Sequence, residues 1–317
     1  MPAVSLKNIV KTYNNGNLKA VNNVSFDVER GELFGLIGPD GAGKTSIFRI
    51  LTTVLLADKG QASVEGHDVV KEYRWIRNKV GYMPGKFSLY QDLTVAENLN
   101  FFATVFNTTL EKNYDLIKDI YDQIKPFNNR PAGKLSGGMK QKLALCCALI
   151  HKPEVLFLDE PTTGVDVVSR KEFWEMLKRL KQQGISILVS TPYMDEASLC
   201  DRIALIQNGN IMSVDTPQNI INSFPANLYA AKAKDIYKLL NDFRNDSAVE
   251  SCYAFGEYLH LTLYDAHNGD AIIKDLADKY RPEDFEAKLT TPTIEDSFIR
   301  LMMQHGENAD VNGKHNE

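Results

Sequence analysis

The stretch Gly38-Pro39-Asp40-Gly41-Ala42-Gly43-Lys44-Thr45-Ser46 decides the fold, because its glycines and its Gly-Lys-Thr-Ser ending are those of a loop that holds phosphate. Residues 33–37, directly ahead of it, are apolar enough for a buried strand, and apolar residues recur at helical spacing over 47–55. In such a strand, loop and helix, backbone N–H groups and the positive end of the helix face the same anion. The sequence therefore predicts a phosphate-binding loop.

Three side chains of this loop have chemistry that suits a nucleoside triphosphate. We expect Lys44 to reach the terminal phosphates, Thr45 to offer its hydroxyl to Mg²⁺, and Ser46 to lie deeper against the phosphate chain. Asp40 places a negative charge beside the phosphates unless its side chain faces water. The alternative is a glycine-rich surface turn that matches by chance, and the flanking strand and helix patterns argue against it.

Composition bounds the kind of protein. At 317 residues the chain is long enough for one large or two moderate domains, and its net charge of −5 does not favour nucleic acid as a partner. No apolar stretch approaches the ~20 residues that span a bilayer, and no signal-peptide pattern opens the sequence, so we expect the chain itself to be soluble. The cysteines, which lack metal-ligand spacing and fit a reducing compartment, are Cys146, Cys147, Cys200 and Cys252.

The order of predicted elements divides the chain into two domains. Strand and helix patterns alternate over residues 1–224, which predicts an α/β domain with a largely parallel sheet. Within it, residues 86–138 are rich in aromatics and helical in pattern after Thr94, so we expect an inserted helical lobe. Residues 225–304 have a βαββαβ order, which predicts a small ferredoxin-like α+β domain of regulatory or dimerising role. The polar tail, 305–317, is expected to be disordered.

Two further motifs stand where elements are predicted to begin or end. The apolar run 155–158 leads directly into Asp159 and Glu160, as expected of a buried parallel strand with carboxylates at its carboxyl end. The segment Leu135-Ser136-Gly137-Gly138-Met139 opens a helix that runs to Ile150. This second Ser/Gly-rich loop at a helix start repeats the anion-binding geometry of the first.

Three motifs, taken together, resemble in their order and spacing those of the nucleotide-binding subunits of ABC transporters. They are the phosphate loop, then Leu135-Ser136-Gly137-Gly138-Met139 followed by Lys140-Gln141-Lys142, and then Asp159-Glu160-Pro161-Thr162-Thr163-Gly164-Val165-Asp166. The resemblance covers residues 1 to about 220 and implies a P-loop NTPase fold of ABC type, with a mostly parallel sheet, antiparallel strands and a helical lobe. It also implies binding of ATP and Mg²⁺.

The resemblance implies a role for each matching residue. Tyr13 matches the aromatic residue that stacks on adenine, Asp159 the carboxylate that supports Mg²⁺, and Glu160 the catalytic residue that polarises the attacking water. Ser136, Gly137 and Gly138 match the signature that, in this family, covers the nucleotide bound by the other subunit. Asp166 matches the loop that links the two sites across the dimer.

Two positions depart from the family pattern. Gly85 stands where the family normally has a glutamine that senses Mg²⁺ and the attacking water, and Pro192 where it has a histidine that bonds the γ-phosphate. Proline offers no side-chain donor, and a solvated Lys86 is not an evident substitute for the glutamine. Because one positioned polar group commonly contributes ~2.7–4 kcal/mol to transition-state stabilisation, we expect hydrolysis at this site to be slowed far more than binding.

The expected partners follow from the contrast between the two departures at this chain's own site and its unaltered signature segment. In the family, each complete site takes the signature from the other subunit, so a chain with an impaired own site and an intact signature predicts a heterodimer with a second ATP-binding subunit. Segments 87–99, 190–196 and 291–296 look like exporter subunits for drugs, lipids or polysaccharides, which work beneath a separate membrane-spanning permease. This places the chain peripherally, on the cytoplasmic side of the membrane.

Alternatives remain open at this point. The chain could hold ATP as a non-catalytic scaffold while its partner alone turns over, which Gly85 and Pro192 favour and Lys44 and Glu160 do not. Soluble members of the superfamily act on ribosomes or DNA, but they usually carry tandem ATPase halves or long coiled coils, which this sequence lacks. The aromatic residues of the helical lobe either receive a helix of the permease or form the lobe's own core. They include Phe87, Tyr90 and Phe101.

Overall fold

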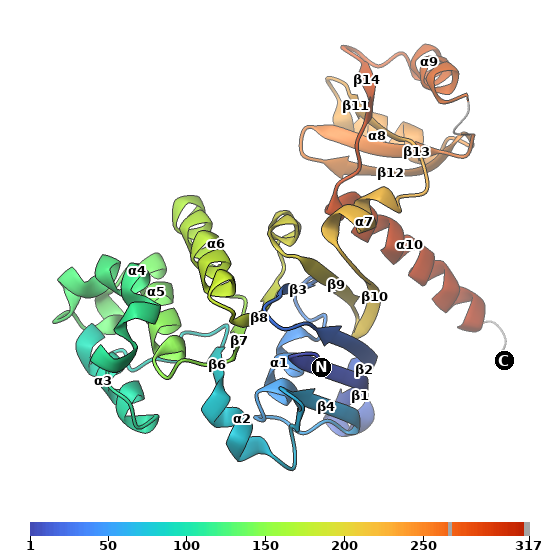
Figure 1. The fold of residues 1–317 in the computed structure, drawn as a ribbon. Coiled ribbons are helices and arrows are strands. Elements are labelled where there is room, and N and C mark those ends of the chain that lie inside the picture. Colours follow the sequence, from blue (N-terminus) through green and yellow to red (C-terminus); the bar gives the residue numbers. More distant parts are fainter. Residues whose placement is uncertain (266–267, 314–317) are drawn as a thin grey trace. The chain divides into compact units, whose positions relative to one another are not determined.

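A six-stranded sheet forms the centre of the first part of the protein in a computed structural model, which describes residues 1–265 and 268–313 (Figure 1). Its strand order is β10-β9-β3-β8-β7-β6, in which β9 to β6 are parallel and β10 is an antiparallel edge. Every residue of β3, β7 and β8 is buried, which is why apolar residues dominate these strands and their polar residues lie at the strand ends. The strands are β3 (Leu33–Ile37), β6 (Val80–Met83), β7 (Val155–Asp159), β8 (Ser186–Thr191), β9 (Arg202–Gln207) and β10 (Asn210–Asp215).

A four-stranded antiparallel sheet of order β2-β1-β4-β5 packs on the same core. Phe26 of β2 stacks flat on Phe34 of β3 with ring centroids 5.3 Å apart, so aromatic packing joins the two sheets. The helices α1 and α2 contribute Ile47, Phe48 and Ile76 to this core. These elements are β1 (Val4–Tyr13), β2 (Leu18–Val28), β4 (Lys59–Val64), β5 (His67–Asp68), α1 (Lys44–Leu51) and α2 (Tyr73–Lys79).

A group of helices interrupts the parallel sheet between β6 and β7 (green in Figure 1). Thr94 begins it with a capping box, because its hydroxyl accepts from the N–H of Glu97 while the Glu97 carboxylate accepts from the N–H of Thr94. The helices are α3 (Val95–Val105), α4 (Tyr114–Ile124) and α5 (Gly137–Leu149), and α6 (Val167–Gln182) follows β7. Short 3₁₀ segments are η1 (Asn14–Gly16), η2 (Glu111–Asn113), η3 (Lys125–Phe127), η4 (Ala132–Lys134) and η5 (Met194–Leu199).

Strand order positions the functional loops. Because β3 lies beside β8 and β8 beside β7, and all three are parallel, the loops that follow them emerge at the same edge of the sheet. These loops carry the phosphate-binding stretch, the segment after Thr191 and the acidic pair at Asp159. Residues far apart in the sequence therefore meet at one site.

The chain divides into two compact units, which we describe separately: Met1–Gln218 with the segment from Gln304, and Asn219–Met303. The second unit has an antiparallel sheet of order β12-β13-β11-β14, so its two βαβ halves interleave as in ferredoxin-like domains. The α/β class with a small α+β part, predicted from the sequence, is confirmed. Its elements are α7 (Pro217–Asn222), β11 (Leu228–Lys232), α8 (Ile236–Arg244), β12 (Val249–Phe255), β13 (Tyr258–Leu263), α9 (Gly269–Tyr280) and β14 (Glu286–Thr290).

The last helix corrects one expectation about the tail. Helix α10 spans Ile294–Gly313, so residues 305–313, expected to be disordered, continue it. The physical reason is that adding residues to a helix that is already capped and packed is far easier than nucleating a new one. Residues 314–317 of the predicted tail lie outside the described residues. Within the described part of the chain, no helix is long and apolar enough to cross a membrane.

A buried polar cluster holds the start of α10 against the ferredoxin-like sheet. Asp296, fully buried, accepts from His260 Nδ1 at 2.6 Å, from the Tyr253 hydroxyl at 2.7 Å, and from the N–H and hydroxyl of Thr293 at 2.7 Å each. Burial raises the pKa of Asp296, but the hydrogen bonds from His260, Thr293 and Tyr253 outweigh it and hold the pKa below its usual range. The charged carboxylate is therefore the stable form.

Replacing this carboxylate is expected to destabilise the unit strongly. Asp296→Ala leaves several buried donors unpaired, so we expect a loss of about 3 kcal/mol in the free energy of unfolding, measured by urea denaturation of the full chain. The neighbouring Glu295 is exposed, and Glu295→Ala should cost less than about 1 kcal/mol. Since the pKa is depressed, the contribution is present above about pH 4 and disappears as the pH falls further. Equal losses in the two variants would contradict this.

Candidate functional site

The phosphate loop is built where glycine alone fits. It links β3 to α1, and Gly41 and Gly43 have φ angles of +78° and +107°, in the left-handed region that other residues rarely adopt. A Cβ at Gly43 would lie 2.2 Å from the carbonyl oxygen of Ala20, and one at Gly38 would lie 2.1 Å from that of Ile206. The backbone is thus packed closely from behind, and Lys44 begins helix α1 at the end of the loop.

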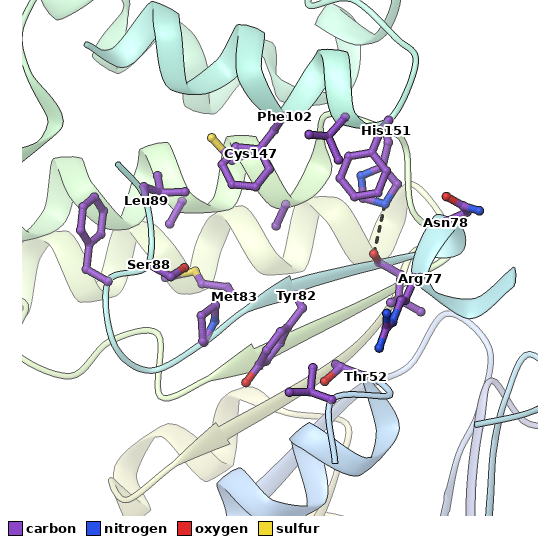
Figure 2. A pocket seen from close by; sticks show the side chains of 18 of the residues that line it. Thr52, Arg77, Asn78, Tyr82, Met83, Ser88, Leu89, Phe102, Cys147 and His151 are labelled. Carbon is purple, nitrogen blue, oxygen red and sulfur yellow. Dashed lines mark hydrogen bonds between the residues drawn. The ribbon is translucent and has the colours of Figure 1, made fainter. Parts of the chain in front are cut away.

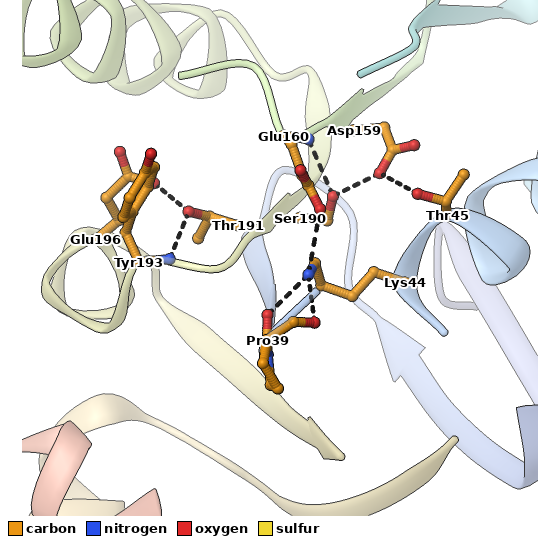
Figure 3. Close-up of polar contacts among 10 residues, drawn as sticks. Pro39, Lys44, Thr45, Asp159, Glu160, Ser190, Thr191, Tyr193 and Glu196 are labelled. Atoms are coloured by element: carbon orange, nitrogen blue, oxygen red, sulfur yellow. Dashed lines mark hydrogen bonds and ion pairs between the residues drawn. The ribbon is translucent and has the colours of Figure 1, made fainter. Parts of the chain in front are cut away.

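Lys44 points back across the loop (Figure 3). Its ammonium donates to the carbonyl oxygens of Gly38 at 2.7 Å and Pro39 at 2.9 Å, and it lies 3.2 Å from Glu160 Oε1. The lysine side chain is 2% exposed, whereas that of Glu160 is 23% exposed. A nearly buried cation with carbonyl and carboxylate partners is poised to exchange some of them for phosphate oxygens.

Asp159 ends β7 beside the loop (Figure 3). Its Oδ1 accepts from the hydroxyl of Thr45 at 3.3 Å and from that of Ser190 at 2.8 Å. Hydroxyl and carboxylate oxygens are the ligands that Mg²⁺ prefers, and these two lie next to the lysine that faces the loop. The donor set of Thr45 and Asp159 therefore fits Mg²⁺ held with a phosphate chain.

Glu160 turns sharply away from the strand. Its φ angle of +51° is unusual for a residue with a side chain. Its N–H donates to the carbonyl oxygen of Ser190 at 3.1 Å and to the Ser190 hydroxyl at 3.0 Å. The turn directs the carboxylate towards Lys44 rather than into the sheet, which leaves it accessible at the loop.

Tyr13 reaches the same site from the antiparallel sheet. Its hydroxyl lies 3.1 Å from the hydroxyl of Ser46 on α1, and the ammonium of Lys11 lies 5.8 Å from the centre of its ring. The structure thus brings Tyr13 to Ser46 at the end of the phosphate loop, although the two residues are 33 positions apart in the sequence.

The signature segment lies elsewhere. Ser136 caps α5 by accepting from the N–H of Met139 at 3.4 Å, and a Cβ at Gly138 would lie 2.7 Å from the hydroxyl of Ser169. Asp166 caps α6 by accepting from the N–H of Ser169 at 3.0 Å, a bond that lowers the pKa of Asp166. Among the described residues, no hydrogen bond or ion pair joins Ser136 to the phosphate loop. Ser136 and Gly137 are exposed.

The two departures from the family pattern lie at the site. A Cβ at Gly85 would be 3.0 Å from the carbonyl oxygen of Asp159 and 3.9 Å from its Cγ, so any side chain at this position would start beside the acidic pair. Pro192 follows Thr191, the last residue of β8. Neither position supplies a polar side-chain group to the site.

Two polar residues of the site, Ser190 and Glu196, were not identified from the sequence. Ser190 joins Asp159 and Glu160, and the buried Glu196 accepts from the hydroxyl of Thr191 (Figure 3). Glu196 also accepts from the hydroxyl of Thr162 at 3.1 Å. Hydroxyl residues at the end of a buried apolar strand were the available signal for Ser190. Glu196 offered none, because an acidic residue after a strand is usually exposed.

Tyr82 lines a groove beside this site and is close enough to Asp159 for the charge of that carboxylate to affect it. Burial and then the charge of Asp159 raise the pKa of Tyr82 to about 12, so its hydroxyl stays protonated. The groove, about 430 Å³, lies between β6 and helices α3 and α5, and Tyr82, Met83, Phe102 and His151 line it (Figure 2).

The aromatic residues of the lobe are not simply its core. Tyr90 and Phe101 are 50% and 39% exposed and pack edge to face with ring centroids 4.9 Å apart. Phe87 is half-buried and lines the groove. His151 stacks on Phe106, and burial lowers the pKa of His151 to about 4, so the groove is uncharged at this wall at neutral pH.

A glycine-rich loop with its lysine, an acidic pair at the adjacent strand end and a separate Ser-Gly-Gly helix start define a P-loop nucleotide-binding domain of the cassette type. A family model described as ABC transporter matches residues 21–163. A Nod factor export ATP-binding protein I from Burkholderia lata is 39% identical over 69% of this chain and 73% of its own length. The chain belongs to the ATP-binding proteins of ABC transporters.

Two further similarities agree with this family. A probable multidrug ABC transporter ATP-binding protein, YbhF of Escherichia coli, is 36% identical over 94% of this chain and 52% of its own length. The chain thus spans about half the length of that relative. A solved dimeric ATP-binding cassette, in a post-hydrolysis state bound to ADP and Pi, has a TM-score of 0.61 at 25% identity and covers 67% of this chain and 98% of its own.

Proposed function

We propose that this protein is the ATP-binding subunit of an ABC exporter, which couples binding and hydrolysis of Mg-ATP to transport through a separate membrane-spanning permease. The observation that carries the proposal is the meeting of Lys44, Thr45, Asp159 and Glu160 at the end of the parallel sheet. The relatives whose names refer to multidrug and Nod factor export support the exporter branch.

Each residue has a defined part in this proposal. The loop N–H groups from Gly38 to Ser46 and the Lys44 ammonium bind the phosphates, and Tyr13 stacks on adenine. Thr45 and Asp159 hold Mg²⁺, which would neutralise charge that develops on the phosphate oxygens. On binding, the phosphates draw Lys44 away from Glu160, and the freed carboxylate orients the attacking water.

This chain's own nucleotide site lacks two polar side chains, whereas its signature segment, Ser136 to Gly138, matches the family pattern. Gly85 and Pro192 supply no polar side chain, so we propose that hydrolysis in this chain's own site is slow. The exposed Ser136 and Gly137, with Gly138 behind them, would cover the nucleotide of a partner. We therefore propose a heterodimer with a second ATP-binding subunit that carries the glutamine and the histidine missing here. The solved dimeric cassette supports a dimeric arrangement.

The permease would contact the groove beside the site. Its lining is largely apolar and flanked by the exposed Tyr90 and Phe101, which suits an amphipathic helix of a membrane protein. Tyr82 and Met83 of the groove lead directly to Gly85 at Asp159, so a helix seated there would touch the segment that borders the nucleotide. This role requires a peripheral position on the cytoplasmic side of the membrane.

The domain roles complete the proposal. Residues 1–224 form the ATP-binding domain with a helical lobe over 86–138, and residues 225–304 form a regulatory or dimerising domain. The second candidate function is an ATP-clamping scaffold whose partner alone turns over, and the absence of polar side chains at Gly85 and Pro192 favours it.

The decisive experiment compares two variants in the complete transport complex. Glu160→Gln removes the residue that orients water in this chain's own site, and we expect it to lower total ATP turnover by less than about two-fold. Ser136→Arg places a bulky cation where the partner's nucleotide must be covered, and we expect a loss of at least about 100-fold.

The control for Ser136→Arg is Thr94→Arg. Thr94 also caps a helix of the lobe, so this variant introduces the same side chain at an equivalent local position, and turnover should stay close to wild type. If Glu160→Gln abolishes turnover, the chain's own site is the productive one. If Ser136→Arg has no effect, the chain does not complete a partner's site.

A further inference from the structure

Ser190 occupies a buried position between the two acidic residues. Its side chain on β8 is 0% exposed, and its hydroxyl donates to Asp159 Oδ1 at 2.8 Å while accepting from the N–H of Glu160 at 3.0 Å (Figure 3). A serine hydroxyl has one hydrogen to donate and lone pairs to accept with. Both capacities are therefore used, each on a different member of the acidic pair.

The Glu160 backbone needs such support. Its φ angle of +51° is unfavourable for a residue with a side chain, and a conformation of this kind persists only when neighbouring groups hold it. Ser190 supplies two acceptors to the Glu160 N–H, its hydroxyl at 3.0 Å and its carbonyl oxygen at 3.1 Å. The carbonyl oxygen is part of the backbone, so any residue at position 190 would supply it. The hydroxyl acceptor, in contrast, depends on the serine side chain.

Asp159 depends on the same hydroxyl. Among the described residues, the side chains that hydrogen-bond to its carboxylate are those of Thr45 and Ser190. Thr45 is a candidate ligand of Mg²⁺, so its hydroxyl oxygen would turn to the metal and its bond to Asp159, already 3.3 Å long, would be available for exchange. Gly85 lies next to Asp159 but has no side chain that could replace the Thr45 hydrogen bond to Asp159.

We propose that Ser190 is the positioning residue of this site: it orients the Asp159 carboxylate for the metal and holds the Glu160 turn in place. This inference rests on the proposed function, because it assumes that Asp159 supports Mg²⁺ bound with ATP. Partners that orient a metal ligand commonly change metal affinity by about ten- to hundred-fold when they are removed. Ser190 should therefore act on the contribution of Mg²⁺ and not on the phosphate loop.

The test measures the dissociation constant of ATP for the full chain by calorimetry, once with excess Mg²⁺ and once with EDTA. The ratio of the two constants isolates the gain that Mg²⁺ confers. For Ser190→Ala we expect this gain to fall by about ten-fold or more, while the constant in EDTA stays within about two-fold of wild type.

Ser186→Ala is the matched control. Ser186 is buried on the same strand, but its hydroxyl accepts from the N–H of Gly31 at 3.0 Å, at the opposite end of β8. Ser186→Ala loses one buried side-chain hydrogen bond, and Ser190→Ala loses two, although the Glu160 N–H keeps the Ser190 carbonyl oxygen as an acceptor. We expect each lost bond to lower the melting temperature by about 2–4 °C, so both variants should stay folded. Only Ser190→Ala should reduce the Mg²⁺ gain.

Several results would overturn the inference. An unchanged Mg²⁺ gain in Ser190→Ala, an equal fall in both variants, or weaker binding in EDTA alone would each show that the hydroxyl does not position a metal ligand. A wild-type ratio of one would show that Asp159 holds no metal with ATP. A wild-type chain that binds no ATP under either condition would instead overturn the proposed function, and the inference with it.

Discussion

The double variant Gly85→Gln with Pro192→His is expected to raise ATP turnover by this chain's own site by at least about 100-fold, because each polar group positioned at a transition state contributes ~2.7–4 kcal/mol. A side chain at position 85 would begin beside the Asp159 carboxylate, and its Cβ, 3.0 Å from the Asp159 carbonyl oxygen, needs only a small backbone adjustment. Position 192 follows directly on β8, whose end lies beside the phosphate loop.

The measurement is steady-state phosphate release by the purified full chain at saturating Mg-ATP. ATP affinity should change by less than about three-fold, because the added groups act mainly on the transition state. The triple variant that also carries Glu160→Gln is the control, and it should lose the gain if Glu160 orients the water. Unchanged turnover in the double variant, with normal ATP binding, would show that these two positions do not limit the site.

Lys44→Ala is expected to weaken ATP binding by at least about 100-fold, because charge-assisted hydrogen bonds to phosphate are among the strongest polar contacts. The lysine is almost completely buried, and its ammonium is held inside the loop by the carbonyl oxygens of Gly38 and Pro39. Its removal also leaves Glu160 without the cation 3.2 Å away, which adds repulsion between the carboxylate and the incoming phosphates.

The affinity of the full chain for ATP is measured by calorimetry in the presence of Mg²⁺. Lys142→Ala is the matched control, since Lys142 is also largely buried and paired with a carboxylate, that of Glu172 at 2.7 Å, but lies on α5. It should bind ATP as wild type does. Equal affinities of wild type and Lys44→Ala would contradict the phosphate-binding role of the loop.

Features that depend on local sequence were predicted well. The glycine-rich phosphate loop, the apolar centres of β3, β7 and β8, and the helical pattern after Thr94 were predicted from neighbouring residues. Backbone and periodicity requirements of this kind are local. The βαββαβ order of the second unit was also predictable, because alternation of the kind seen at Leu259, Leu261 and Leu263 is a property of one strand.

Other elements escaped prediction for physical reasons. Strands β9 and β10 were not identified individually, since β9 takes its place by pairing with β3, and the edge strand β10 by pairing with β9. The continuation of α10 through 305–313 was missed because the composition of a polar segment does not reveal the helix that precedes it. Strand pairing and helix propagation both depend on residues outside the segment itself.

The sequence by itself determined the fold class, the phosphate loop and the family, because these rest on residue types at short, fixed spacings. Only the tertiary structure decided which polar groups meet. Ser190 and Asp159 are 31 positions apart and His260 and Asp296 are 36 apart, yet each pair shares a buried hydrogen bond. Such pairs form because a buried donor or acceptor must find a partner, and the packing of strands and helices in space determines which partner lies within reach.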